Sequence, residues 1–397
     1  MKTSINIAAK KLAWQATNTK LLNPVRPKIF HSNAYYLEGV TKRSECALSA
    51  IVFGEIEFAY YFSKLAYKEE PKMKYEGKKA LADIPKVISS LKPDLCFINI
   101  PSAFSKFLTS NEFFAMPYVE FALDISESLE AIYAKMGHKT RQKIQKIEKA
   151  KPIYEVSNDP NQLKFFYDEL YVPFILKRHG KASRLISFEE CSRIFKKGGL
   201  MLTHLDGLIA SGLLFEKDND ELSIAIRGES KEFWSKNLGY HSYYSILQWA
   251  KQLKFSTINF GSCPPFPKDG LFEFKREWGA AIKPPRERDE RMFGLRFCNL
   301  KGGAQDFLFD NPIIFARERK LEMLAIKNSK PEILFSFNKT PGLNKAVVVS
   351  AAPFKVKCFE KLENSMEGYI SESTYLPLQT FAKLASDESF KVYEVNF

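Results

Sequence analysis

Two short segments between residues 200 and 283 combine residue types that could do chemistry. The first is the turn Lys236-Asn-Leu-Gly-Tyr-His-Ser242. A glycine at a helix start lets backbone N–H groups approach an anion, which the helix dipole also favours. Lys236 adds a positive charge, and His241 titrates near neutral pH, so it could accept a proton. The turn predicts an anion site at a helix start, although His241 could equally be a packed histidine.

The second segment is Asp269-Gly-Leu-Phe-Glu-Phe-Lys-Arg-Glu-Trp-Gly. It places Lys275 and Arg276 between the aromatic residues Phe274 and Trp278. A cation beside a reacting carbonyl stabilises the negative charge that develops on its oxygen. Taken alone, the same pattern is also typical of a core helix whose charges face solvent.

The elements that must position these segments follow from the hydrophobic pattern. Three closely spaced apolar runs predict an antiparallel meander, followed by a long amphipathic helix, a strand, a proline-rich loop and a short helix. Their expected ranges, in order, are 200–205, 208–216, 222–227, 234–251, 257–261, 263–269 and 271–278. The first candidate segment thus falls at the start of the long helix, and the second falls in the short one.

The rest of the chain alternates in the same way. We predict strands at 47–58, 95–100, 118–124 and 153–156, and helices at 80–91, 161–177 and 187–195, with Ser126 capping another helix. Beyond residue 300 we predict helices at 312–327 and 376–385 and strands at 333–337, 345–349 and 390–395. This alternation predicts a layered α/β (α+β) fold with a small C-terminal α/β appendage.

The segment 135–151 predicts a strongly basic helix. Seven Lys or Arg side chains against one Glu give a net charge of 7 − 1 = +6. Met136, Ile144 and Ile147 can share one face, which leaves most basic side chains elsewhere. A solvated face and an anion-binding surface fit this pattern equally well.

Taken together, these segments resemble the GNAT-fold acyltransferases of the Fem type (FemAB) and the related CelD/BioF2-like acetyltransferase domain. The resemblance rests on the order of two strands, the Lys236-x-x-Gly-x-His turn, a third strand and the Phe274-Lys-Arg-x-Trp-Gly box. It covers 126–283 and, more loosely, 45–125 as a degenerate first half. It implies tandem GNAT-like domains, each with a mixed central sheet flanked by helices.

The resemblance also implies a reaction. An amine of a cell-envelope or polysaccharide precursor would attack an activated acyl carbonyl, carried by an acyl-CoA thioester or an aminoacyl-tRNA ester. Lys275 would lie near that carbonyl or the donor phosphates, and His241 could be the base for the amine. Such an enzyme would need an acyl donor and an acceptor but no metal.

Four residues are expected to contact the donor: Lys236, Gly239, Ser242 and Arg276. Ordinary GNAT enzymes have a small residue at the end of their phosphate loop, where this chain has His241. The bulkier side chain argues against acetyl-CoA and leaves the aminoacyl-tRNA ester open.

Four other residues are expected to contact the substrate: Arg178, His179, Arg227 and Asp269. Arg178 and His179 belong to the stretch Tyr171-Val-Pro-Phe-Ile-Leu-Lys-Arg-His-Gly, which resembles the part of the family that faces the acceptor. An arginine can bind a phosphate or carboxylate through two parallel hydrogen bonds. A solvated helix end before Gly180 is the alternative.

Composition limits the remaining possibilities. The charge of 59 − 46 = +13 favours an anionic partner such as a phosphate-bearing cofactor, a nucleic acid or an anionic lipid surface. A nucleic-acid-binding protein using helix 135–151 therefore stays as an alternative. The altered Lys236–His241 turn leaves an inactive GNAT-fold scaffold as another. The six cysteines lie at least 35 residues apart, which gives no paired metal-ligand motif. Glu55 and Glu57 interrupt the longest apolar run, so no integral membrane segment is expected.

Four segments are predicted along the 397 residues. They are a basic N-terminal segment (1–44), the degenerate GNAT-like half (45–125), the acyltransferase domain (126–300) and the C-terminal region (301–397). The first 37 residues contain six Lys or Arg and no acid. We expect a cytoplasmic protein, with peripheral association at the inner membrane surface as an open alternative.

Overall fold

A computed structural model describes residues 30–101, 114–284, 291–299, 302–317, 320–327, 340–343, 345–350, 355–361 and 368–375. The chain forms two compact units. Unit 1 comprises Met1–Phe114, Phe293–Asp306 and Ala382–Phe390, and unit 2 comprises Ala115–Met292, Phe307–Phe381 and Lys391–Phe397. These units divide the chain at other positions than the four predicted segments, whose functional division stays a prediction.

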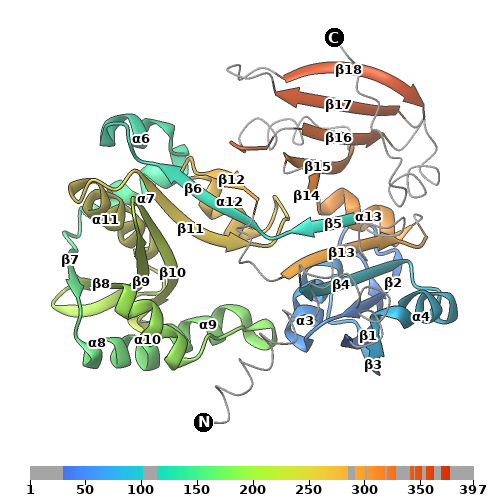
Figure 1. The fold of residues 1–397 in the computed structure, drawn as a ribbon, viewed down its shortest axis with the longest axis horizontal. Coiled ribbons are helices and arrows are strands. Elements are labelled where there is room, and N and C mark those ends of the chain that lie inside the picture. The colour runs from blue at the N-terminus through green and yellow to red at the C-terminus, as the bar shows by residue number, and fades with distance from the viewer. Residues whose placement is uncertain are drawn as a thin grey trace, which may run out of the picture. The chain divides into compact units, whose positions relative to one another are not determined.

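Unit 1 is built on a mixed sheet (Figure 1). Its strands are β1 (His31–Val40), β2 (Ala47–Phe53), β3 (Lys72–Ala80), β4 (Leu95–Pro101) and β13 (Arg291–Phe297), in the order β3-β1-β2-β4-β13, with β5 (Phe114–Pro117) as the sixth strand of the sheet. β1 and β2 form an antiparallel hairpin, and β4 runs parallel to β2. The helices are α3 (Ile56–Ala66), α4 (Ile84–Leu91) and the start of α13 (Gly303–Asp310).

The predicted strand 47–58 is wrong beyond Phe53. Helix α3 begins at Ile56, and its buried residues include Phe58 and Phe62, one helical turn apart. This spacing of apolar residues buries one face of a helix, which a strand could not do. The predicted strand 95–100 and the helix at the end of 80–91 are confirmed as β4 and α4.

Unit 2 contains a seven-stranded sheet in the order β12-β6-β11-β10-β9-β8-β7. The strands are β6 (Val119–Asp124), β7 (Ile153–Ser157), β8 (Gly198–Leu205), β9 (Leu208–Asp218), β10 (Glu221–Glu229), β11 (Thr257–Cys263) and β12 (Ala281–Lys283). The predicted meander is confirmed as β8, β9 and β10, and β11 runs parallel to β10. The predicted mixed central sheet is therefore confirmed.

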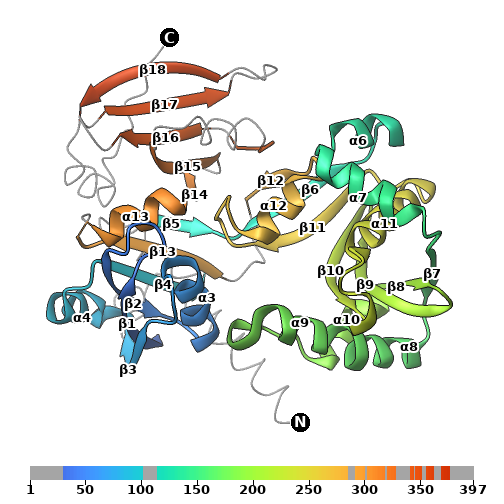
Figure 2. The same cartoon turned by 180° about the vertical axis from the view of Figure 1, so that it is seen from behind.

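Helices cover both faces of this sheet (Figure 2). They are α6 (Leu129–Lys135), α7 (His138–Glu148), α8 (Pro160–Phe165), a π-helical turn (Phe166–Tyr171), α9 (Val172–His179), α10 (Phe188–Lys197), α11 (Leu238–Gln252) and α12 (Gly270–Arg276). Alternate residues of the strands face opposite sides. Met201 and Leu213 pack with α11, whereas Leu202 and Leu214 pack with the α8–α10 region.

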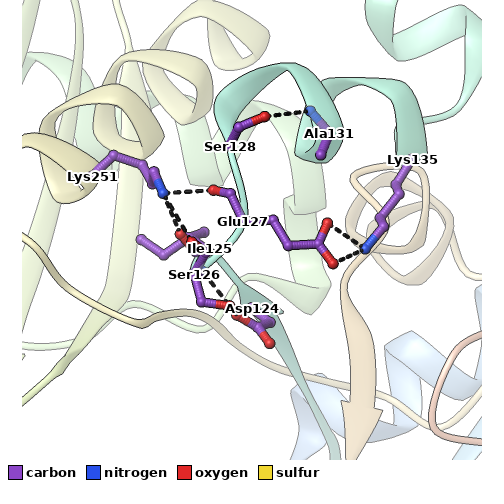
Figure 3. A network of polar contacts seen from close by, with 8 residues as sticks. All are labelled: Asp124, Ile125, Ser126, Glu127, Ser128, Ala131, Lys135 and Lys251. Atoms are coloured by element: carbon purple, nitrogen blue, oxygen red, sulfur yellow. Dashed lines mark hydrogen bonds and ion pairs between the residues drawn. The ribbon is translucent and has the colours of Figure 1, made fainter.

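The predicted helix cap at Ser126 is wrong. The N-cap of α6 is Ser128, whose side chain accepts the N–H of Ala131 (Figure 3). Ser126 instead donates its hydroxyl to Asp124 Oδ1 at 2.6 Å and so belongs to the turn after β6. Lys251 at the end of α11 holds this turn, with Nζ bonded to main-chain carbonyls that include Ile125 O at 2.8 Å.

The sequence predicts an α/β C-terminal region, but the helix that it predicts at 312–327 is wrong. The residues form the antiparallel strands β14 (Ile313–Arg317) and β15 (Lys320–Lys327), which begin a five-stranded sheet with β16 (Lys345–Ser350), β17 (Lys355–Lys361) and β18 (Gly368–Tyr375). Pairing with neighbouring strands overrides a helical pattern in a short apolar run. The strand predicted at 345–349 is confirmed, whereas those at 333–337 and 390–395 and the helix at 376–385 lie outside the described residues.

In the described ranges, no helix is long and apolar enough to cross a bilayer.

Candidate functional site

The parallel strands β10 and β11 pair over only three residues each. The register joins 221–223 to 257–259, although β10 continues to Glu229 and β11 continues to Cys263. Beyond Ser223 and Asn259 the two strands do not pair with each other. Their peptide groups on these facing edges are therefore not used in pairing the two strands.

Both strands are irregular where they separate. The β10 register against β9 shifts between Ile224 and Ile226, and the β11 register against β6 shifts between Asn259 and Ser262. A bulge bends its strand and increases the local twist. Gly261, inside the second irregularity, has φ +74°, and a Cβ there would lie 3.2 Å from the carbonyl oxygen of Ile224. A glycine is needed at this close approach.

Lys275 reaches the separated end of β11 from helix α12. Its Nζ donates hydrogen bonds of 2.9 Å to the carbonyl oxygens of Gly261 and Ser262. The side chain is buried, and loss of hydration lowers the pKa of its ammonium group. The two carbonyl dipoles partly replace the lost water. A buried cation is thus held at the point where the strands diverge.

A buried polar link holds the same bend from the other side. Glu120 on β6 accepts the side-chain N–H of Asn259 at 2.9 Å, and Asn259 Oδ1 accepts the backbone N–H of Gly261 at 2.7 Å. Both side chains are buried. Because a buried polar group is costly unless it is paired, this link fixes the bend to which Lys275 is bonded.

Asp269 caps the helix that carries Lys275. Its Oδ1 accepts the N–H groups of Leu271 at 2.9 Å and Phe272 at 3.4 Å. A carboxylate at this position satisfies helix-end donors and complements the dipole. The geometry gives Asp269 a positioning role, and its predicted contact with substrate stays a prediction.

The thiol of Cys263, at the end of β11, is buried close to this cation. Burial raises the pKa of Cys263 to about 12. The thiol is therefore protonated at neutral pH, so Cys263 is a poor candidate for a nucleophile.

Aromatic rings join α11, β11 and α12 into one cluster. Tyr243 packs against Phe260, Phe274 and Trp278, with ring centroids 5.1, 5.0 and 5.6 Å apart. The aromatic residues around Lys275 are therefore packing residues that fix α12 against α11.

His241 lies inside the packing of α7 against α11. Its Nδ1 is 2.7 Å from Glu148 Oε1 and its Nε2 is 3.0 Å from Ser245 Oγ. Burial lowers the pKa of His241, and Glu148 opposes that shift. With both ring nitrogens engaged, His241 could act as a base only by giving up one of these contacts.

Ser242 is also used inside the fold. Its Oγ is 2.8 Å from the Oγ of Ser211 and donates to the carbonyl oxygen of Leu238 at 3.2 Å. It is buried between α11 and the meander. The predicted donor contact of Ser242 stays a prediction.

The start of α11 is occupied by a carboxylate of the chain itself. Glu229 Oε1 accepts the backbone N–H of Gly239 at 2.9 Å and a hydrogen bond from Arg227 Nη1 at 2.6 Å. A Cβ on Gly239 would lie 2.0 Å from Arg227 Nη1, so the glycine makes room for the guanidinium. An anion does lie at this helix start, as the sequence predicts, but it is Glu229.

The two remaining predicted donor contacts lie in different surroundings. Lys236 is exposed just before α11. Arg276 is buried on α12, where its Nη2 is 4.0 Å from Glu273 Oε1, and its Nε and Nη1 have no hydrogen-bond partner within the described ranges.

The structure brings Arg178 and Arg227 together, and the sequence predicts that both contact the substrate. Their guanidinium carbons lie 5.7 and 4.9 Å from the ring centroid of Phe174. Arg178 and the neighbouring His179 are exposed residues at the end of α9.

The basic helix is confirmed as α7, with Met136 just before it and Ile144 and Ile147 on its buried face. Two of its cations serve packing: Lys143 Nζ bonds Tyr240 Oη at 2.9 Å, and Arg141 Nη1 bonds the carbonyl oxygen of Met136 at 2.7 Å. The exposed side chains Lys139, Lys146 and Lys149 share the outer face. The exposed lysines fit the solvated face that the sequence predicts, and the alternative of an anion-binding surface stays a prediction.

Sequence reasoning missed Glu229, Glu120, Asn259 and Phe174. Glu229 had a local signal, because it follows Arg227 by two positions and so shares its side of the strand. Glu120 and Asn259 had none, since their contact depends on pairing between distant strands. Among the described residues, no group of three His, Cys, Asp or Glu could hold a metal ion.

No family model and no curated protein matches this chain. Several solved structures are similar to it. FemX is 15% identical, covering 65% of this chain and 83% of its own at a TM-score of 0.38. The C-terminal domain (DUF2156) of a putative lysylphosphatidylglycerol synthetase from Agrobacterium fabrum is 14% identical, covering 66% and 80% at 0.35. A GCN5-related N-acetyltransferase from Anabaena variabilis is 10% identical, covering 89% and 76% at 0.29.

Two of these names, FemX and GCN5-related N-acetyltransferase, match the protein classes that the sequence resembles. This similarity concerns the fold.

Proposed function

We propose that this chain is an N-acyltransferase whose reaction takes place where β10 and β11 separate. The observation that supports this best is the buried ammonium group of Lys275, bonded to the carbonyls of Gly261 and Ser262 at that point. Two strand edges that share no ladder leave peptide groups for a carbonyl substrate. A fixed cation beside them is suited to stabilising an oxyanion.

In this reaction an amine nitrogen attacks the carbonyl carbon of a thioester or ester, and a C–N bond forms. The carbonyl oxygen becomes negative, and Lys275 is the cation that stabilises it. The intermediate then collapses, the C–S or C–O bond breaks, and the proton lost by the amine goes to the leaving thiolate or alkoxide. His241 could relay this proton only by releasing Ser245 or Glu148.

The proposed donor is an aminoacyl-tRNA ester or an acyl-CoA thioester, and the proposed acceptor is an amine of a cell-envelope or polysaccharide precursor. Because Glu229 already binds Gly239 at the start of α11, a donor that places no diphosphate there is favoured. This supports the aminoacyl-tRNA ester. A cytoplasmic location, with the acceptor reached at the inner membrane surface, belongs to the same proposal.

The donor can be tested by thermal unfolding of the full chain with acetyl-CoA, a long-chain acyl-CoA, free CoA and bulk aminoacyl-tRNA. A donor present at about 100 times its Kd adds ~2.7 kcal/mol to the free energy of unfolding. We expect a rise in Tm with aminoacyl-tRNA and none with uncharged tRNA. A rise with all CoA species instead would assign the thioester as donor, and silence from every donor would contradict the proposal.

The role of Lys275 can be tested with a matched control. Lys275→Met removes the ammonium group, whereas Lys251→Met removes another lysine whose Nζ also bonds main-chain carbonyls, at the far end of α11. Loss of transfer in the first variant alone supports the proposal. Equal loss in both would mean that only packing had been disturbed.

A further inference from the structure

Two arginines from different elements lie against one aromatic ring. Arg227 belongs to β10, and Arg178 lies at the end of α9, one helical turn after Phe174. Their guanidinium carbons are 4.9 and 5.7 Å from the ring centroid of Phe174. Attraction between a cation and an aromatic face explains why each arginine rests there. It does not explain why two like charges share a single ring.

Of the two arginines, Arg227 alone forms an ion pair with a residue that the structure describes. Arg227 pairs with Glu229, whose side chain is buried and whose Oε1 also accepts the N–H of Gly239. Arg178 makes no ion pair with any residue that the structure describes. Glu229 and Asp269 attract Arg178 electrostatically, but neither carboxylate forms an ion pair with it, so its guanidinium donors have no anionic partner among the described residues.

The surroundings of Arg178 favour a bound anion. Its guanidinium is partly desolvated although the residue is exposed. This desolvation, with repulsion from Arg227, lowers the pKa of Arg178, and the carboxylates of Glu229 and Asp269 oppose the shift without cancelling it. An anionic ligand would relieve both effects. A guanidinium offers two parallel N–H donors that match the oxygens of a carboxylate or a phosphate.

We propose that Arg178, with Arg227 beside it on Phe174, binds an anionic phosphate or carboxylate group of a substrate. The start of α11 cannot take this group, because the carboxylate of Glu229 already occupies the N–H of Gly239. Naming the ligand as part of a substrate rests on the proposed acyltransferase function, whereas the anion site itself does not. The substrate therefore carries a fixed negative charge in addition to its reacting group.

The site can be tested by calorimetric titration of the full chain with inorganic phosphate and, separately, with acetate, at constant ionic strength. Arg178→Gln should raise the Kd of the preferred anion about tenfold or more, because hydrogen bonds to charged groups are lost. The matched control is Lys177→Gln, which removes the neighbouring exposed positive charge on α9. It should leave the Kd within about twofold, since a single solvated charge is screened by salt.

Phosphate as the preferred anion would indicate a phosphate-bearing substrate, and acetate would indicate a carboxylate-bearing one. Equal weakening by Arg178→Gln and Lys177→Gln, or no binding of either anion, would overturn the proposal. Lys275→Met separates this inference from the proposed reaction. It should abolish transfer and leave the Kd of the anion unchanged, whereas a failed anion site with intact transfer would remove only the inference.

Discussion

The two units repeat one arrangement with different side chains. In unit 1 the hairpin β1–β2 is followed by α3 and later by β4, which runs parallel to β2. In unit 2 the hairpin β9–β10 is followed by α11 and then by β11, which runs parallel to β10. This correspondence agrees with the tandem arrangement that the sequence resemblance implies. The helix after the hairpin is the clearest place to compare them.

The buried faces of the two helices differ in polarity. The buried side of α3 carries the aromatic rings Phe58 and Phe62, which pack against Phe97 of β4. Its buried polar residue, Ser63, donates only to the carbonyl oxygen of Ala59 within the same helix. The buried side of α11 includes His241 and Ser242, each hydrogen-bonded to other side chains. Apolar packing needs no partner geometry, whereas buried polar groups must be paired.

The parallel strands differ in the same way. β4 is buried throughout its first six residues, whereas β11 bends at Gly261 and offers its carbonyl to Lys275. The same layout thus serves packing in unit 1 and holds charge in unit 2. The arrangement of strands therefore does not decide where chemistry can occur; the bend and the charged groups that follow it do.

Removing an aromatic ring from the core of unit 1 should change stability more than any substitution proposed in unit 2. Phe97→Ala should lower the free energy of unfolding by ~3–5 kcal/mol, because it leaves a cavity among buried aromatic rings. Denaturant unfolding measures this loss, and Phe97→Leu should cost clearly less. Transfer by the folded fraction should be unchanged. If Phe97→Ala instead lowered kcat and left the free energy of unfolding unchanged, unit 1 would take a direct part in the reaction. The contrast between the two units would then be wrong.

The next effect is on the reaction in unit 2. Lys275→Met should lower kcat/KM roughly 100- to 1000-fold, equivalent to ~2.7–4 kcal/mol of barrier, because the cation beside the carbonyl is lost. Rates measured under single-turnover conditions, with Lys251→Met as control, report this change. A loss of less than about tenfold would show that Lys275 only ties α12 to β11.

The sequence predicted the elements of unit 2 well because each is a regular hydrophobic pattern. The meander, the basic helix and the strand carrying Gly261 all lie where the spacing of apolar residues places them. Lys275 and Arg227 were also identified, since their residue types stand out beside aromatic or strand patterns. Local patterns therefore located the candidate residues.

Their interactions could not be predicted in the same way. Glu229 occupies the start of α11, and Glu120 reaches Asn259 across two strands, so both contacts depend on the assembled sheet. The helix predicted at 312–327 failed for a related reason. Its residues pair as the strands β14 and β15, and Ile314, Leu321 and Met323 pack into the main core of unit 2, which no local periodicity reveals.

The buried face of α11 includes the titratable residue His241, whereas no buried residue of α3 titrates. Burial lowers the pKa of His241 in the folded protein, so below about pH 6.5 the unfolded chain binds a proton more readily. Stability is then complete above that pH and falls as the pH drops toward the folded pKa, by at most ~1.4 kcal/mol per pH unit. Urea unfolding between about pH 7 and 5 measures the slope, which His241→Gln should reduce. An unchanged slope in the variant would assign it to other groups.

Gly239→Ala should have a small effect, and it tests whether the start of α11 positions Arg227. In Gly239→Ala the new Cβ would meet Arg227 Nη1 at 2.0 Å, and the flexible guanidinium can move away at little cost to the fold. We expect a change of less than about 1 kcal/mol in the free energy of unfolding, within the range of a glycine-to-alanine exchange in a helix. The displaced Arg227 should weaken its ion pair with Glu229, which titration with inorganic phosphate can detect as a Kd altered by a few-fold. If Gly239→Ala left both that Kd and the free energy of unfolding unchanged, the space at Gly239 would not be what holds Arg227 in place. The start of α11 would then differ from the start of α3 in its residues but not in its effect on anion binding.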